Sequence, residues 1–185
     1  GLGARPLGMG GTFAAICDDA TAPVWNPAGI SLVDTRQAVM MYSNQFDMDI
    51  YMNYVGYVQP VSYLGSFGFT YAQMNTGFIP VTTQKDAYGR PIIERYMSNN
   101  ESAFVLTWAK DLARRKASMG LNVKFLSQTF DDVHGRGVDL DLGFLFKPTD
   151  NFAIGINLQD FLIGKMNWEG EDDNLEFTVK TGISG

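Results

Sequence analysis

The sequence predicts an all-β protein whose antiparallel strands form part of a transmembrane β-barrel. Three observations favour this fold: long stretches of strictly alternating side chains, small polar residues opposite the apolar face, and connections that differ in length. Alternation of this length indicates strands rather than helices. Short turns at one rim and long loops at the other are typical of outer-membrane barrels.

The composition narrows the class of protein. Apolar residues make up 45% of the chain and aromatic residues 13%, which excludes a disordered chain. Charged residues make up 18%, below the roughly 25% that is usual in soluble proteins. No apolar run approaches the ~18 residues of a membrane-spanning helix. A soluble all-β protein has nearly the same composition, so the pattern of the strands carries the prediction.

Charge and cysteine content exclude other classes. The net charge is -6, and no basic stripe exists that would bind nucleic acid. Cys17 is the single cysteine, which excludes a disulfide framework or a thiolate metal site; beside Ile16 and alanines it is expected to be a small buried residue. We expect no metal and no cofactor. The chain begins at Gly1 without Met, as a protein does after removal of its signal peptide.

The first 35 residues differ from the rest, because they are glycine-rich and do not alternate. The run around Gly8, Gly10 and Gly11 lacks the Lys-Ser/Thr of a phosphate loop and follows no strand. Its glycines are better explained by close backbone packing or positive φ. Asp18 and Asp19 are expected in a turn or cap rather than on a metal.

A short helix is predicted to begin at Asn26 and Pro27 and to run to about Val33. Asn is a favoured N-cap, and Pro is favoured at the first helical position. From there the period of the sequence changes to two. Eight strands are predicted, at residues 37–44, 49–59, 62–74, 102–110, 117–128, 137–147, 151–159 and 175–183.

The connections between these strands are short around 59–61, 111–115 and 148–150, intermediate to short at 45–48 and 131–135, and long at 75–101 and 161–174. Strands of this length match the ~9–11 residues that cross hydrocarbon at a tilt. A soluble sandwich or a lipocalin also explains alternation, but with the apolar face pointing inward. Neither explains the difference between the rims or the Gly, Ser and Asn content of the second face.

The strand count bears on the N-terminal segment. An eight-stranded barrel is filled by its own side chains and cannot enclose a plug of about thirty residues. We therefore interpret residues 1–35 as a plug and residues 36–185 as the first part of a larger barrel wall. The remainder of that barrel is expected to be absent from this chain.

Three motifs carry a family resemblance: Gly3-Ala4-Arg5-Pro6-Leu7-Gly8-Met9-Gly10-Gly11-Thr12-Phe13, Asp18-Asp19-Ala20 and Trp25-Asn26-Pro27-Ala28-Gly29. Together they resemble the N-terminus of the FadL/PorV superfamily of outer-membrane proteins, with a glycine run closer to the PorV/PorQ-like and uncharacterised members. The resemblance implies a barrel of about 14 strands with an N-terminal hatch inside. It also implies location in the bacterial outer membrane, in contact with membrane lipid or lipopolysaccharide.

The leading functional hypothesis is passive uptake of hydrophobic small molecules, gated by the plug. Ligand binding would shift the plug between closed and open states. Asn26, Pro27 and Ala28 are the candidate gating residues, with Leu7, Met9 and Phe13 as candidate lining. The alternative is that all six only pack the plug against the wall.

A second hypothesis is a PorV-like accessory barrel that docks a type IX-style secretion channel or holds cargo at the cell surface. In the connection 75–101, the stretches 80–85 and 91–96 could pair as a hairpin around 86–89. This connection carries more apolar residues than a solvated loop needs, namely Phe78, Ile79, Tyr88, Ile92, Ile93 and Tyr96. They predict either a substrate entry platform or a partner surface.

We do not expect an enzyme. His134 is the single histidine and lies in the predicted turn 131–135, and no serine stands in a nucleophile-elbow setting. Asp139 and Asp141 alternate onto the predicted lumen face, where carboxylates are ordinary. The acidic loop residues Glu169, Glu171, Asp172 and Asp173 beside Trp168 are expected to be solvated rather than to bind a cation.

Overall fold

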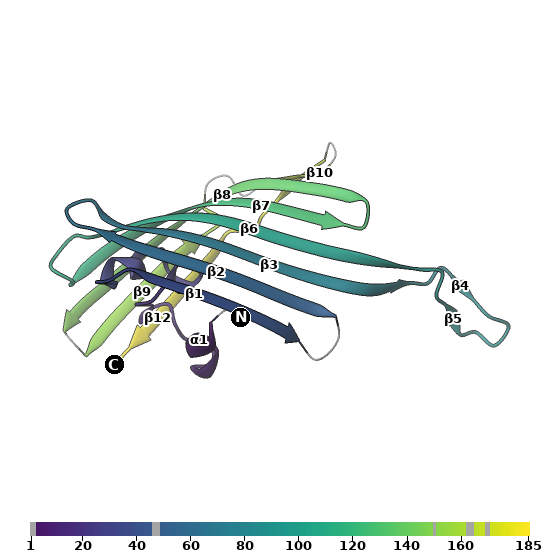
Figure 1. Cartoon of the computed structure of the whole chain (residues 1–185), viewed down its shortest axis with the longest axis horizontal. Coiled ribbons are helices and arrows are strands. Elements are labelled where there is room, and N and C mark those ends of the chain that lie inside the picture. The colour runs from purple at the N-terminus through teal and green to yellow at the C-terminus, as the bar shows by residue number, and fades with distance from the viewer. Residues whose placement is uncertain (1–2, 46–48, 150, 162–164, 169–170) are drawn as a thin grey trace.

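One curved antiparallel sheet contains most of the chain, and the N-terminal segment, described for residues 3–35, lies inside its curve (Figure 1). The computed structural model describes residues 3–45, 49–149, 151–161, 165–168 and 171–185; the side chains of Phe78 and of residues 171–173 are not described. The strands are β1 (Gln37–Gln45), β2 (Ile50–Val61), β3 (Gly65–Val81), β4 (Gln84–Lys85), β5 (Pro91–Ile92), β6 (Arg95–Asp111), β7 (Ala117–Phe130), β8 (Val133–Thr149), β9 (Phe152–Gln159), β10 (Lys165–Trp168), β11 (Glu171–Asn174) and β12 (Thr178–Ser184).

Ten of these strands form the main sheet, in which β1, β2, β3, β6, β7 and β8 pair antiparallel in that order, while β4 and β5 form a separate two-stranded sheet. The long strand β8 then has two partners on its second edge. Residues 135–138 pair with β10, and residues 142–149 pair with β9. β10 continues to β11, and β9 continues to β12. Within the described residues, β1 and β12 each pair along one edge only.

The all-β antiparallel prediction is confirmed, but the predicted long loop at 75–101 is wrong. β3 continues to Val81 and β6 begins at Arg95, because their ladder resumes after an irregularity between Thr76 and Ile79. The predicted hairpin within this stretch is confirmed, since β4 pairs with β5 around residues 86–90. It bends away from the far end of the sheet (Figure 1).

The predicted loop 161–174 is also wrong, because it contains β10 and β11, which extend the sheet from β8. Two predicted strand starts need correction. Tyr63 has φ 59° and lies in the turn before β3, so it does not share a face with Phe67. The last strand begins at Thr178, after Leu175 and Phe177.

Three short helices form the N-terminal segment: α1 (Ala4–Gly8), α2 (Ala22–Trp25) and the 3-10 helix η1 (Pro27–Leu32). The predicted start of η1 is confirmed, because the Asn26 side chain accepts a hydrogen bond from the Ala28 N–H at 3.1 Å. α1 and α2 were not predicted. Asp19 lies in the turn before α2, where its Oδ1 accepts a hydrogen bond from the Thr21 N–H at 2.8 Å. In the described part of the chain no helix has the length and apolar character needed to cross a membrane.

The apolar core lies between the N-terminal segment and the inside of the sheet near its short turns. From the segment it takes Phe13, Cys17 and Ile30, and from the sheet Val58 and Leu145. Cys17 is fully buried, as predicted. The core therefore joins residues more than a hundred positions apart.

The two faces of the sheet differ as the alternation predicts. Many of the residues that point inward are small or polar, and Thr70, Thr107 and Asn122 among them are buried. Residues that point outward are large and apolar, and they remain exposed: Phe67, Leu106, Phe125, Phe144 and Phe146. The polar face of the sheet is thus the covered one.

Candidate functional site

Asn26 connects the N-terminal segment to two strands of the sheet. Its Nδ2 donates to the main-chain carbonyls of Ala14 and Phe144, both at 3.0 Å, and of Ile156 at 3.4 Å. Its Oδ1 receives the Ala28 N–H. The side chain is fully buried, and an unpaired amide there would be costly. One side chain therefore caps η1 and joins it to β8 and β9.

Glycines on the inward face allow this close approach. A Cβ at Gly120 on β7 would overlap the backbone of Pro27, and one at Gly143 on β8 would overlap the Asn26 side chain. A Cβ at Gly155 on β9 would overlap the carbonyl of Ala14. Three neighbouring strands thus carry glycine where the segment contacts them.

Two further amide side chains of the wall hold carbonyls of the segment. Asn122 Nδ2 donates to the Pro23 carbonyl at 2.8 Å, and Asn157 Nδ2 donates to the Trp25 carbonyl at 2.9 Å. Asn122 Nδ2 also donates to Asp141 Oδ2 at 2.9 Å, while its Oδ1 accepts from Thr107 Oγ1 at 2.8 Å. Asn122 therefore links the segment to a group of buried charges.

This charge cluster consists of Lys124, Asp139, Asp141 and Asp160. The Lys124 Nζ lies 2.6 Å from Asp139 Oδ2, 2.7 Å from Asp141 Oδ1 and 2.7 Å from Asp160 Oδ1. An ammonium has three N–H donors and no acceptor, and this one forms ion pairs with three carboxylates and donates a hydrogen bond to Asp160 Oδ1. The two strand carboxylates are almost fully buried.

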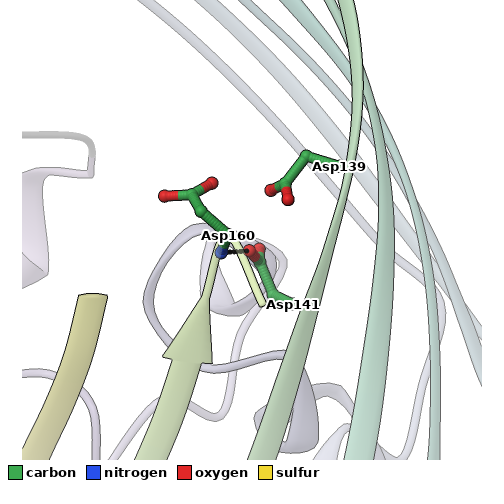
Figure 2. A group of neighbouring side chains, drawn as sticks. All are labelled: Asp139, Asp141 and Asp160. Atoms are coloured by element: carbon green, nitrogen blue, oxygen red, sulfur yellow. Dashed lines mark hydrogen bonds between the residues drawn. The ribbon is translucent and has the colours of Figure 1, made fainter. Parts of the chain in front are cut away.

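The three carboxylates come from two neighbouring parts of the sheet (Figure 2). Asp139 and Asp141 lie on β8, and Asp160 follows the end of β9 with its backbone N–H 3.2 Å from Asp141 Oδ1. One oxygen of each lies within 4.8 Å of the others, which is the spacing of a cation site. In this arrangement the Lys124 ammonium takes the place of the cation, with a surplus of two negative charges.

An apolar cavity of about 320 Å³ opens on the inward face beyond the charge cluster. Its apolar lining is Met52, Ala72, Met74, Ala103, Leu126, Met166 and Leu175, and its polar lining includes Glu101 and Gln128. On β7 three successive inward residues show the order of the layers: Asn122 contacts the N-terminal segment, Lys124 belongs to the cluster, and Leu126 lines the cavity. A mainly apolar cavity with few polar groups is typical of small-molecule sites.

The structure brings together four of the six residues predicted to gate or line the plug. Asn26, Pro27, Ala28 and Phe13 are buried in or beside the contact between segment and wall. Leu7 and Met9 lie away from it, 52% and 38% exposed near α1. None of the six lines the apolar cavity.

The residues predicted as a partner or entry surface lie mostly on the projecting hairpin. Tyr88 is 85% exposed, and Ile92, Ile93 and Tyr96 are also exposed. Ile79 pairs opposite Met97 in the β3–β6 ladder. The backbone of Phe78 belongs to β3, but its side chain is outside the description. The acidic residues 169–173 cannot be placed as a site, since 169–170 and the side chains of 171–173 lie outside the described residues.

Sequence reasoning missed the roles of Lys124, Asn122, Asn157 and Asp160. The first three stand at inward positions of alternating strands, and the short turn after β7 places Lys124 opposite Asp139 in the register. The register that this short turn imposes on β7 and β8 is a signal in the sequence, and it predicts that Lys124 faces Asp139. Asp160 has no such signal, because it reaches the cluster from beyond the end of β9.

Comparisons of the chain with protein-family models, with curated proteins and with solved structures gave no match.

Proposed function

We propose that this chain is the plug and part of the wall of an outer-membrane β-barrel that lets hydrophobic small molecules pass. The observation that carries the proposal is the inversion of the two sheet faces. A soluble β-protein buries its apolar face, whereas here the small polar face is covered and the large apolar side chains are exposed. Such a surface is stable where hydrocarbon, rather than water, surrounds the sheet.

The apolar outward surface has the height of a membrane. On β8 the outward residues from Val138 to Phe146 are all apolar, as are those from Phe104 to Trp108 on β6. At about 3.4 Å per residue the stretch on β8 spans about 27 Å, or about 21 Å at a tilt of about 40°. The apolar band of outer-membrane barrels is about 25 Å tall. Farther along β8, Arg136 and His134 stand outward, so the surface becomes polar there.

Closure of the barrel requires strands beyond those described. β1 and β12 each offer a free edge within the described residues, and free edges are not stable in a membrane. The N-terminal segment also occupies space that a closed eight-stranded barrel does not have. We therefore propose that further strands join β12 to β1.

The plug is held to the sheet by hydrogen bonds that are individually weak enough to break when the plug moves. Asn26, Asn122 and Asn157 join it to the wall, and each such bond contributes about 0.5–1.5 kcal/mol. A ligand that binds the open state better can therefore displace the segment by a shift in population. The apolar cavity provides a place for that ligand on the same inward face, beyond the charge cluster.

The experiment uses the full-length protein in the outer membrane of a Gram-negative host. Entry of the hydrophobic dye N-phenyl-1-naphthylamine is followed by its fluorescence. We expect faster entry with the intact protein than with an empty vector, and faster entry still after deletion of residues 1–34 or with Asn26→Ala. Leu7→Ala is the matched control, because Leu7 belongs to the segment but is exposed.

Equal dye entry for the intact protein, the deletion and the empty vector would end the transport proposal. The membrane proposal has a separate test. If the full-length protein is soluble and monomeric without detergent, the exposed apolar face does not contact hydrocarbon and the membrane proposal is wrong.

A second function is favoured by the projecting hairpin. Its exposed Tyr88, Ile92 and Ile93 extend beyond the sheet, where a partner protein could cover them. This is the arrangement expected of an accessory barrel that docks a secretion channel or holds cargo. Tyr88→Ser with Ile93→Ser should abolish surface display of secreted proteins and leave dye entry intact. Lys85→Ser in the same hairpin is the control, and an unchanged display would exclude this function.

A further inference from the structure

The apolar cavity lies in the two rows of inward residues beyond the charge cluster. Ala72, Ala103 and Leu126 are cross-strand neighbours in the first row. Met52, Met74 and Glu101 are neighbours in the second. Methionines adapt their shape to irregular apolar contents. The second row therefore places the carboxylate of Glu101 at the edge of a mainly apolar cavity.

Glu101 is held by neutral partners. Its Oε1 accepts from Asn99 Nδ2 at 2.7 Å and from Gln128 Nε2 at 3.1 Å. Across the residues that the structure describes, no ion pair joins Glu101 to a lysine or arginine. The cavity lining, too, contains no lysine, arginine or histidine.

The opposite boundary of the cavity is also negative. Lys124 is the inward residue next to Leu126, and its Nζ forms ion pairs with three carboxylates within 2.7 Å. Its single positive charge is therefore already more than offset, and an anion in the cavity gains no net cation from it. The charge cluster as a whole carries two negative charges in excess.

We propose that the apolar cavity binds neutral or amine-bearing apolar molecules and rejects carboxylates such as fatty acids. This inference rests on the proposed transport function, and it names the substrate class for the same barrel. A carboxylate in the cavity loses its hydration without gaining a cation and is repelled by Glu101. An ammonium donates a charge-assisted hydrogen bond to the same carboxylate. A hydroxyl can bind through neutral hydrogen bonds.

The size of the cavity sets the choice of probes. A volume of about 320 Å³ equals the liquid volume of about ten water molecules. Eight-carbon chains with one polar group match it. We therefore choose octylamine, octanol and octanoate, which at neutral pH are cationic, neutral and anionic.

The test measures binding of the three radiolabelled probes to the full-length protein in phosphatidylcholine vesicles at neutral pH. Binding to empty vesicles is subtracted. We expect octylamine and octanol to bind and octanoate to bind at least about tenfold more weakly than octylamine. Ala103→Trp should abolish binding of all probes because it fills the cavity. Ala103→Leu is the milder version for the case in which the tryptophan does not fold.

Glu101→Gln separates charge from shape. The amide keeps an oxygen that can accept from Asn99 and Gln128. We expect octylamine binding to weaken about tenfold, octanoate binding to strengthen and octanol binding to stay the same. The inference is overturned if octanoate binds as tightly as octylamine, or if Glu101→Gln leaves their ratio unchanged.

Dye entry distinguishes the failure of this inference from the failure of the transport function. If the dye enters through the protein but octanoate is not disfavoured, only the substrate class is wrong. If no probe binds above the level of Ala103→Trp and the dye does not enter, the transport function fails and the inference fails with it.

Discussion

The side chain of Asn26 donates a hydrogen bond to the main-chain carbonyl of Phe144 at 3.0 Å, across 118 positions of the sequence. Asn26 also starts η1 through its contact with the Ala28 N–H. A local helix cap and a long-range contact therefore depend on the same amide. The stability of the N-terminal segment and its position on the sheet are coupled through this side chain.

Asn26→Ala should destabilise the segment by about 2–4 kcal/mol, because it removes the cap and leaves buried carbonyls of Ala14 and Phe144 without this donor. Trypsin cleavage after Arg36, at the end of the segment, in the folded full-length protein measures the effect. Cleavage should become faster in the variant, while Leu7→Ala should behave as the original protein. An unchanged cleavage rate would show that Asn26 does not hold the segment.

Gly143→Ala should displace the segment from β8, because the added Cβ overlaps the Asn26 side chain. Overpacking of this kind costs about 1–3 kcal/mol. The matched control is Gly77→Ala on β3, where a Cβ meets only ordinary contacts at 3.8 Å. Hydrogen exchange of residues 13–33 is the measurement. Equal protection in both variants would contradict the close approach.

The sequence predicts the strands well where alternation is strict, as in β7 and β8, since one buried and one exposed face leave a period of two. It fails at 75–101 because Gln73, Asn75 and Asn99 are polar on both sides of the sheet, so alternation of hydrophobicity ends although the hydrogen-bonded ladder continues. Main-chain hydrogen bonds between strands do not depend on side-chain polarity, so the sequence pattern does not reveal them in this stretch.

The candidate site is predictable in part for the same reason. Asn26 and Pro27 carry a local signal, because capping depends on adjacent residues. The contacts of Asn122 and Asn157 with the segment depend on where the chain returns after about a hundred residues, and alternation shows only that they point inward. The apolar cavity needs residues from five strands and the segment after β11, so no single stretch reveals it.

Lys124→Met should be strongly destabilising, by about 3–5 kcal/mol, because it leaves three neighbouring carboxylates without their cation. Combining it with Asp139→Asn and Asp141→Asn should restore much of the loss, since the variant then carries one carboxylate in place of three. Samples of both variants are heated to a series of temperatures and then run on gels. The temperature at which the band of the folded form disappears measures their stability. If the triple variant is no better than Lys124→Met alone, charge is not the cause.

Cys17 reports on the seating of the N-terminal segment. Burial raises the pKa of its thiol from 9.0 to about 12, and thiolate is the reactive form. Iodoacetamide at pH 8 should therefore leave Cys17 unmodified in the folded protein and modify it readily in urea, as mass spectrometry of its peptide would show.

The buried Cys17 thiol also makes stability depend on pH. The folded state retains a proton that the unfolded state loses above pH 9, so this group's contribution to stability falls as the pH rises from about 9 to about 12. Asn26→Ala should accelerate modification of Cys17 at pH 8, because the displaced segment exposes the thiol, whereas Leu7→Ala should not. Rapid modification of the original protein would mean that the segment does not stay seated on the sheet.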